Sequence, residues 1–165
     1  MTLSLATATV VDAAPVAALR ASAAERLTDL HGHGHWSSRP TEAGVLRAIK
    51  TSRVLVGRSR GDVVATLTLA TKKPWAIDLA YFTKVERALY LHDMAVAPRL
   101  QRRGVGRKML EEARSIARAW PAHAIRLDAY DADAGAGGFY GRCGFREVGR
   151  VTYRKTPLVY YELVL

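Results

Sequence analysis

Cysteine is almost absent from this chain of 165 residues, since Cys143 is the only one. A single cysteine cannot form an internal disulfide and offers a metal ion no cluster of thiolates. Long apolar runs are missing too: the stretch 1–19 is interrupted by Asp12 and Pro15, and no run approaches the roughly 20 residues of a membrane span. The same stretch lacks the basic start of a signal peptide. We therefore expect a soluble, cytoplasmic protein without a membrane partner.

Acidic residues are scarce as well, because 15 Asp and Glu stand against 25 Lys and Arg and leave a net charge of +10. A positive field favours polyanionic partners such as nucleic acid, acidic protein or a phosphorylated cofactor. The basic residues are spread along the chain, without a basic tail or a dense run interleaved with aromatics. This distribution indicates a solvated basic surface and argues against a nucleic-acid partner. With 49% hydrophobic residues, the chain can build a folded core.

Apolar periodicity and turn residues divide the chain into strands and helices. We predict strands over 3–11, 53–57, 62–70, 89–96, 124–129, 145–151 and 158–164, and helices over 13–30, 41–50, 104–120 and 133–142. Asp12 can cap the first of these helices. The order β-α-α-β-β-β-α-β-α-β-β has no linker or repeat, and it predicts one α+β domain over residues 1–165 with a mixed sheet.

The stretch PRLQRRGVGRKML, residues 98–110, joins a predicted strand to an amphipathic helix. The first N–H groups of a helix have no intrahelical partner and carry the positive end of the helix dipole. Gly104 and Gly106 let the backbone approach a ligand without an intervening Cβ. Further donors and positive charge come from Gln101, Arg102, Arg103 and Arg107. We predict an anion cradle for a phosphate or pyrophosphate; its spacing is neither the dinucleotide GxGxxG nor a P-loop.

The segment MAVAPRLQRRGVGRKML resembles the acyl-CoA signature [QR]-x-x-G-x-[GA] of the GNAT superfamily of N-acetyltransferases, with Gln101, Gly104 and Gly106 at the defining positions. A second segment, DADAGAGGFYGRCGF, is similar to the family's N-x-x-A-x-x-F-Y-x-x-x-G-F pattern. The two motifs stand in the family's order, with the expected strand and helix between them. The resemblance implies the GNAT fold, a mixed central sheet flanked by helices, with strands that splay around an acyl-CoA site.

The resemblance also implies which residues bind coenzyme A. In the family, loop amides hold the pyrophosphate and the backbone of the preceding strand pairs with the pantetheine. These roles would fall to Met94, Ala95 and Val96 on the strand, to Gln101, Arg102, Arg103, Gly104, Val105, Gly106 and Arg107 on the loop and helix start, and to Phe139 in the second motif. Asp133 departs from the pattern, because the family commonly has Asn there. A carboxylate at this position would repel a phosphate but could cap the short helix.

Acetyl transfer from a thioester to an amine requires a neutral amine, a polarised carbonyl and protonation of the departing thiolate. By resemblance, Tyr140 protonates the sulfur; the alternative is a half-buried tyrosine that packs beside Phe139. His92 is the candidate base, because imidazoles exchange protons near neutral pH. Strand alternation puts His92 on the face of Met94, and Asp93, the fallback base, on the other face. The alternatives are a histidine that merely satisfies a strand end, and a reaction that uses water instead of a side-chain base.

Three segments are predicted to surround the acceptor: the loop 31–39, the irregular connection 72–87 and the last two strands. In the loop HGHGHW, His31, His33 and His35 are separated by flexible glycines, and no carboxylate or cysteine stands at a ligand spacing, so we predict no metal site. Family analogy instead places a histidine or Trp36 on the acceptor; the alternative is a flexible surface loop. Aromatic walls are expected from Trp75, Tyr81 and Phe82, each of which could equally belong to the core. Cys143 has no predicted catalytic role.

The sequence thus predicts an acetyl-CoA-dependent N-acetyltransferase that acts by direct transfer to the primary amine of a small molecule. Three alternatives stay open at this point: a protein or peptide amine as acceptor, a non-catalytic acyl-CoA-binding domain, and a nucleic-acid-binding domain. The last strand, LVYYELVL, carries apolar residues that would either serve a homodimer interface or complete the core.

Overall fold

A computed structural model describes residues 1–165 and contains one seven-stranded sheet of order β1-β2-β3-β4-β5-β7-β6. The strands are β1 (Ser4–Thr7), β2 (Arg53–Ser59), β3 (Asp62–Ala70), β4 (Ala88–Val96), β5 (Ala124–Tyr130), β6 (Arg146–Tyr153) and β7 (Thr156–Val164). The helices are α1 (Ala13–His31), α2 (Glu42–Thr51), α3 (Val105–Ala119) and α4 (Gly137–Arg142). All neighbouring strands are antiparallel except β4 and β5. The predicted element order and the α+β class with a mixed sheet are confirmed.

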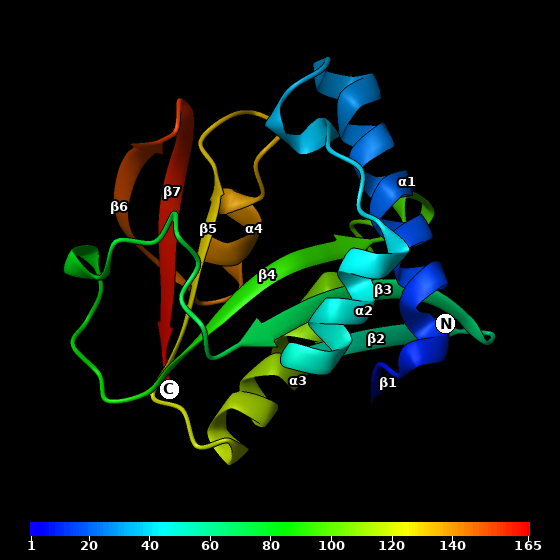
Figure 1. Ribbon diagram of the computed structural model, residues 1–165, viewed down its shortest axis with the longest axis horizontal. Helices are drawn as coiled ribbons and strands as arrows, with labels where there is room; N and C mark the ends of the chain where they lie inside the picture. The colour runs from blue at the N-terminus through cyan, green and yellow to red at the C-terminus, as the bar shows by residue number, and fades with distance from the viewer.

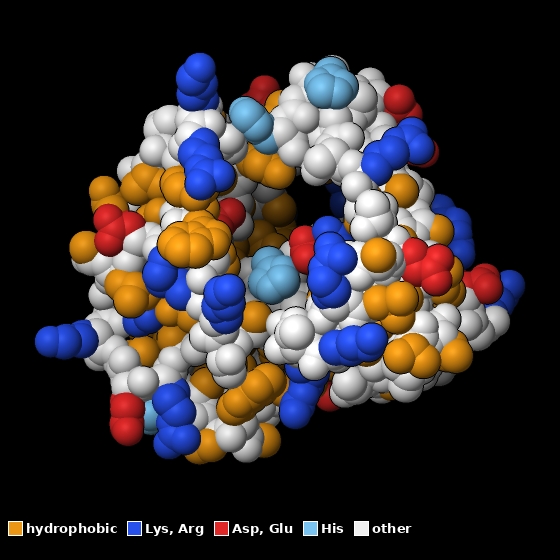
Figure 2. Space-filling view, in the orientation of Figure 1, with side chains coloured by type: hydrophobic (Ala, Val, Ile, Leu, Met, Phe, Trp, Pro, Cys, Tyr) orange, Lys and Arg blue, Asp and Glu red, His pale blue; other side chains and the backbone are white.

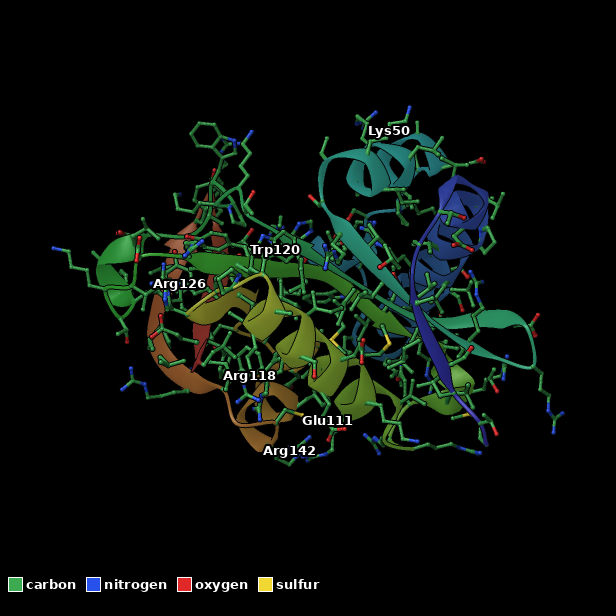
Figure 3. All side chains as sticks on the ribbon, turned by 90° about the horizontal axis from the view of Figure 1, so that it is seen from below. Lys50, Glu111, Arg118, Trp120, Arg126 and Arg142 are labelled. Carbon is green, nitrogen blue, oxygen red and sulfur yellow. The ribbon has the colours of Figure 1, made fainter.

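Helices cover both faces of the sheet: α1 and α2 lie on one face, and α3 and α4 on the other (Figure 1). Helix α3 buries Val105, Met109 and Ala113 against the sheet and turns Glu111 and Arg118 away from it (Figure 3). None of the helices is both long and apolar enough to cross a membrane.

The first strand ends earlier than predicted, and Asp12 is the reason. Residues Val10–Asp12 form a 3-10 turn instead of continuing β1. The buried Asp12 carboxylate accepts the Thr9 N–H at 2.8 Å and pairs with Arg58 at 2.6 Å. Asp12 does not cap α1 with its side chain, so the predicted cap is wrong. The carboxylate instead fixes the turn that leads into the helix.

The fourth helix is shorter than predicted, since it begins at Gly137 rather than at Asp133. Asp133 is exposed and lies outside the helix, whose cap residue is Ala136, so Asp133 does not cap it. Two causes explain the late start. Glycines weaken a helix by up to about 1 kcal/mol each relative to alanine, and a Cβ on Gly135 would collide with the carbonyl of Tyr130. The chain therefore turns tightly at the end of β5 before α4 can begin.

The last strand lies inside the sheet, between β5 and β6. Residues 158–163 are all buried, and only Val164 among the apolar residues of β7 is largely exposed, at 54%. Of the two alternatives for this strand, its apolar residues therefore complete the core. They do not form a surface on which a second copy could dock.

A buried ion pair fastens the irregular segment 71–87 to the sheet. Arg126 of β5 and Glu162 of β7 pair at 3.0 Å, with side chains 7% and 0% exposed. Glu162 also accepts the Thr83 N–H at 3.1 Å, and Arg126 donates to the Thr83 carbonyl. Nearby, the Tyr160 hydroxyl donates to the Ala76 carbonyl. These bonds preorganise the segment, which carries one wall of the cleft.

We expect the Arg126→Met variant to lose about 3 kcal/mol of unfolding free energy, because it leaves the Glu162 carboxylate buried and poorly compensated. Urea denaturation followed by circular dichroism measures the loss. Arg146→Met is the matched control: Arg146 faces the same carboxylate at 3.8 Å, but its side chain is 70% exposed, so removing it should cost less than about 1 kcal/mol. Equal losses in the two variants would contradict a dominant role for the buried pair.

Candidate active site

A cleft opens where β4 and β5 separate. The two parallel strands pair only over Ala88–Tyr90 and Ala124–Arg126; beyond these residues β5 continues along β7. Between its pairs with Thr66 and Thr68 of β3, β4 carries one extra residue, and Asp93 in this bulge has a φ of 54°. A bulge bends its strand and re-aims the side chains that follow. The second half of β4 therefore has no strand partner on its β5 side.

The cleft forms a cavity of about 690 Å³, which appears as a deep hollow on the face shown in Figure 2. Its lining comes from β4, β5, the start of the segment after β3, the helix–loop region α1 to α2, and α4 with the loop before it. Its charged side chains are Arg20, Lys72, Lys73, Asp93 and Asp128, together with the imidazole of His92. A cavity of this size lies within the range of small-molecule sites.

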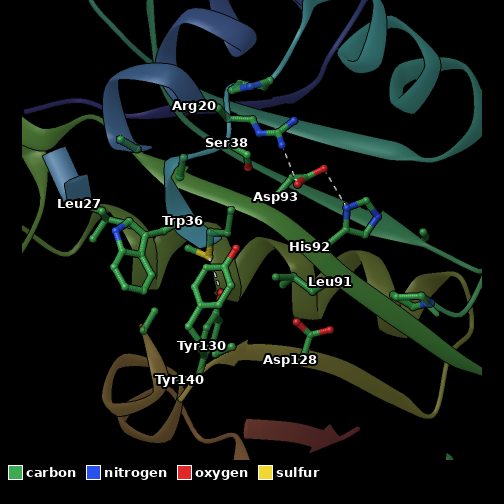
Figure 4. Close-up of a pocket in the computed structure, with 18 of the residues that line it drawn as sticks. Arg20, Leu27, Trp36, Ser38, Leu91, His92, Asp93, Asp128, Tyr130 and Tyr140 are labelled. Atoms are coloured by element: carbon green, nitrogen blue, oxygen red, sulfur yellow. Dashed lines mark hydrogen bonds and ion pairs between the residues drawn. The ribbon is translucent and has the colours of Figure 1, made fainter. Parts of the chain in front are cut away.

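The bulge in β4 changes the predicted placement of His92 and Asp93. Simple alternation would put them on opposite faces, but both line the cavity, and His92 Nδ1 lies 3.0 Å from Asp93 Oδ2. The other Asp93 oxygen accepts Arg20 Nη2 of α1 at 2.8 Å (Figure 4). Burial would raise the pKa of Asp93, but the hydrogen bond with His92 and the charges of Arg20 and His92 outweigh it, and the pKa lies below its usual value. Asp93 is thus an ionised partner of His92.

Tyr140 on α4 is buried at the inner end of the cavity. Its ring packs against Phe139, Phe145 and Tyr161 at centroid distances of 5.3, 5.7 and 6.0 Å, so its orientation is fixed. The only hydrogen-bond partner of its hydroxyl is the sulfur of Met94 on β4, at 3.8 Å (Figure 4). Burial raises the pKa of the Tyr140 phenol well above its ordinary value, and the Asp128 charge adds to the effect. The phenol therefore stays protonated in neutral solution.

The helix start at α3 has the geometry of an anion cradle. Gly104 adopts a φ of 81°, and a Cβ there would meet no atom within 4 Å. The first amide bonded within the helix is that of Lys108, to the Gly104 carbonyl at 3.1 Å. The N–H groups of Val105, Gly106 and Arg107 consequently have no helical acceptor. Open space in front of unpaired amides at a helix N-terminus fits a pyrophosphate.

The other predicted coenzyme A residues surround this cradle. Gln101 donates to the Val96 carbonyl at 3.1 Å, so it braces the loop against the end of β4. Arg102 and Arg103 are exposed, and Arg107 donates to the Arg142 carbonyl of α4 at 3.1 Å.

Residues on the cavity side of the cradle pack closely. A Cβ on Gly106 would lie 3.0 Å from Phe139 Cζ and 3.4 Å from Met94 Cε, so a larger residue there would push these side chains apart. Met94 and Ala95 line the cavity itself. Met94 thus connects the start of α3 at Gly106 with the cavity that Tyr140 lines.

The loop after α1 roofs the cavity. We call residues 32–38 the strap. The carbonyl of His35 accepts the Tyr130 hydroxyl of β5 at 3.2 Å, and His35 Nδ1 lies 3.2 Å from the Thr156 hydroxyl of β7. Trp36 packs edge-on against Tyr130, with ring centroids 6.0 Å apart. The strap thereby connects the end of α1 to β5 and β7, across the gap between β4 and β5 (Figure 1). Trp36 lines the cavity, as the sequence predicted.

The predicted acceptor walls are right in part. Trp75 lines the cavity, but Tyr81 and Phe82 do not: both pack against Tyr160, at 5.5 and 5.2 Å. No residue of β6 or β7 lines the cavity. On that side the wall is formed by β5 and the strap instead. The three loop histidines form no group that could hold a metal ion.

The lining residues that the sequence did not predict include Arg20, Asp128 and Tyr130. Arg20 carries no local signal, because the residue with which it pairs is 73 positions away in the sequence. Asp128 interrupts the apolar strand AIRLDAY, and a polar residue in a strand that is otherwise buried was the available signal.

The site has three parts: a gap between the parallel strands β4 and β5, an anion cradle at the start of α3, and a phenol with an imidazole–carboxylate pair. Together they define a transferase that uses a long phosphorylated acyl donor. The model of the acetyltransferase (GNAT) family matches residues 20–145. The chain belongs to this family and is an acetyl-CoA-dependent N-acetyltransferase. The predicted family and enzyme class are confirmed.

Solved structures with the same fold include three that cover nearly the whole chain. Ribosomal-protein-alanine N-acetyltransferase from Brucella melitensis is 20% identical, with 98% of this chain and 99% of that chain covered and a TM-score of 0.76. The structure of yncA from Salmonella typhimurium with acetyl-CoA is 19% identical, with coverages of 100% and 95% and a TM-score of 0.73. IAA acetyltransferase from Bacillus cereus is 14% identical, with coverages of 99% and 100% and a TM-score of 0.63. No curated protein matches the sequence.

Proposed function

We propose that the protein transfers the acetyl group of acetyl-CoA to the primary amine of a small molecule, by direct attack of the amine on the thioester. The observation that carries the proposal is the roofed cavity of about 690 Å³, which meets Tyr140 and the open half of β4 at its inner end. A small amine fits inside it. The strap, which is bonded to β5 and β7 beside the cavity, would hinder the approach of an amine on a folded protein.

His92 prepares the amine in this mechanism. Asp93 holds the Nδ1 side of the imidazole at 3.0 Å, which leaves Nε2 as the proton acceptor. Because the pKa of Asp93 lies below its usual value, the carboxylate keeps its charge at neutral pH and fixes this tautomer. Arg20 in turn fixes the carboxylate. The amine gives a proton to Nε2 as its nitrogen forms the new C–N bond.

Tyr140 completes the transfer from the other side. The donor, acetyl-CoA, supplies an activated acetyl group whose C–S bond breaks as the C–N bond forms. Tyr140 donates its proton to the departing sulfur and is reprotonated by solvent. His92 releases to solvent the proton that it took from the amine. Exclusion of water raises the proton affinity of a thiolate as well as that of a phenolate, so a phenol of raised pKa remains an effective donor here.

The test is an assay of the purified protein with acetyl-CoA and a panel of primary amines that ranges from small molecules to a peptide with a free N-terminus. Thiol release and product mass are the readouts. Acetylation of a small amine supports the proposal. Acetylation of the peptide alone would move the function to peptide amines, and binding of acetyl-CoA without acetylation of any amine would contradict both.

We expect the His92→Gln variant to lower kcat/KM for the amine by about a hundredfold, within the range typical of a lost general base. Glutamine keeps a hydrogen-bond donor for Asp93 but cannot accept the amine proton. His123→Gln, a change at an exposed histidine that does not line the cavity, is the control. A His92→Gln variant that keeps the wild-type rate would assign proton removal to water.

A further inference from the structure

The cavity holds two carboxylates whose surroundings differ. Both oxygens of Asp93 are engaged, one by Arg20 at 2.8 Å and the other by His92 at 3.0 Å. Asp128 makes no hydrogen bond and no ion pair, whereas the two buried carboxylates of the chain are both partnered: Asp12 pairs with Arg58 and Glu162 with Arg126. Asp128 is thus the one unpartnered carboxylate inside the site.

Asp128 stands at the point where the strands separate. Arg126 is the last residue of β5 that pairs with β4, and Asp128 lies two residues further along, so its side chain is on the same face of the strand. Its neighbours Leu127 and Ala129 are buried, whereas Asp128 is half-buried and borders the cavity. Figure 4 shows its carboxylate pointing into the cleft from β5, on the opposite side from His92 of β4.

The environment of Asp128 disfavours a bare negative charge. Burial raises its pKa, and the nearby His92 offsets only part of that rise. A partly desolvated carboxylate without a partner is costly, and the cost disappears when a cation with N–H donors binds to it. No cationic side chain of the cavity fills this role: Arg20 is held by Asp93, Lys73 donates to the carbonyls of Pro74 and Ile77, and Lys72 is exposed.

We propose that Asp128 binds the ammonium form of the acceptor and so selects amines that are positively charged at the reacting nitrogen. This inference rests on the proposed transfer to small amines. The ammonium group sits between Asp128 and His92, where one proton passes to His92 Nε2 and on to solvent before the neutral nitrogen attacks. Asp128 is therefore a specificity-determining residue for alkyl amines, and arylamines, which are neutral near pH 7, gain nothing from it.

Two isomeric probes of equal size test the selection: benzylamine, which is cationic near neutral pH, and 4-methylaniline, which is neutral. We expect Asp128→Asn to lower kcat/KM for benzylamine by about ten- to a hundredfold and to leave the value for 4-methylaniline within about twofold. A loss of structure would affect both probes alike and cancel in their ratio. Asp131→Asn, on an exposed residue that pairs with Arg150 outside the cavity, is the matched control. An unchanged ratio in Asp128→Asn would overturn the proposal.

A second readout does not depend on turnover. The carboxyl carbon of Asp128, followed by NMR, should shift on addition of benzylammonium and stay in place on addition of benzyl alcohol. If the protein acetylates no amine but this shift occurs, the ammonium site stands and the proposed function fails. If amines are acetylated but neither the shift nor the change in selectivity is seen, the function stands and the role of Asp128 is refuted.

Discussion

The Gly104→Asp variant is expected to lose affinity for acetyl-CoA by about a hundredfold or more while it remains folded. Gly104 begins the helix whose free N–H groups face the predicted pyrophosphate site. A Cβ there points into open space, with no atom within 4 Å, so a carboxylate at this position would occupy the place of the anion. Two like charges about 4 Å apart near a protein surface repel by about 4 kcal/mol, and each 1.4 kcal/mol is tenfold in Kd.

The same variant should keep nearly all of its stability. The left-handed φ of 81° costs a residue with a side chain about 1–2 kcal/mol, but an acidic residue at a helix N-terminus returns about 0.3–1 kcal/mol. Calorimetric titration with acetyl-CoA measures the affinity, and circular dichroism checks the fold.

Gly61→Asp provides the matched control for this experiment. Gly61 also has a left-handed φ, of 89°, and an open Cβ position, but it lies in the turn between β2 and β3. It should therefore bear the same strain and leave acetyl-CoA affinity unchanged. Equal affinity in the Gly104→Asp variant and the wild type would show that this helix start does not hold the donor.

Local signals explain why most of the fold could be predicted from the sequence. Helix α3 follows an apolar stripe at helical spacing, and the β2–β3 hairpin follows two apolar runs joined by a turn in which Arg60 and Gly61 both have positive φ. The predictions failed where one side chain or a glycine overrode the pattern. Asp12 ended β1 by accepting a backbone N–H, and Gly135 delayed α4 through its contact with the Tyr130 carbonyl.

The donor half of the site was predictable for a similar reason, since its residues are consecutive and their chemistry depends on local backbone shape. The acceptor half was not, because its parts meet only in the folded chain. Arg20 reaches Asp93 from α1, and a single extra residue in β4 brings Asp93 to the side of His92. Period-two alternation cannot anticipate a bulge, so it assigned the two residues to opposite faces. The role of Asp93 as a partner of His92 emerges only from this geometry.

The Tyr140→Phe variant should lower kcat by about a hundred- to ten-thousandfold and leave the affinity for acetyl-CoA unchanged. The substitution removes only a hydroxyl whose single hydrogen bond is the weak one to Met94 at 3.8 Å, so the ring should keep its packing and the protein its stability. Stopped-flow or steady-state thiol release measures kcat. The matched control is Tyr161→Phe, a buried neighbour whose ring lies 6.0 Å away and does not line the cavity.

The response to the acidity of the leaving thiol separates an acid at Tyr140 from a merely structural tyrosine, whereas the pH profile only checks that the phenol stays protonated. A general acid must be protonated to act, and burial raises the pKa of Tyr140 above its ordinary value, which is about 10. The wild-type rate should therefore not fall from deprotonation of Tyr140 as the pH rises to about 10, because the phenol keeps its proton throughout that range. With Tyr140→Phe, the remaining rate should depend on the thiol leaving group, so a donor whose thiol is more acidic should recover part of the loss. A variant that matches the wild type in kcat would mean that solvent protonates the sulfur.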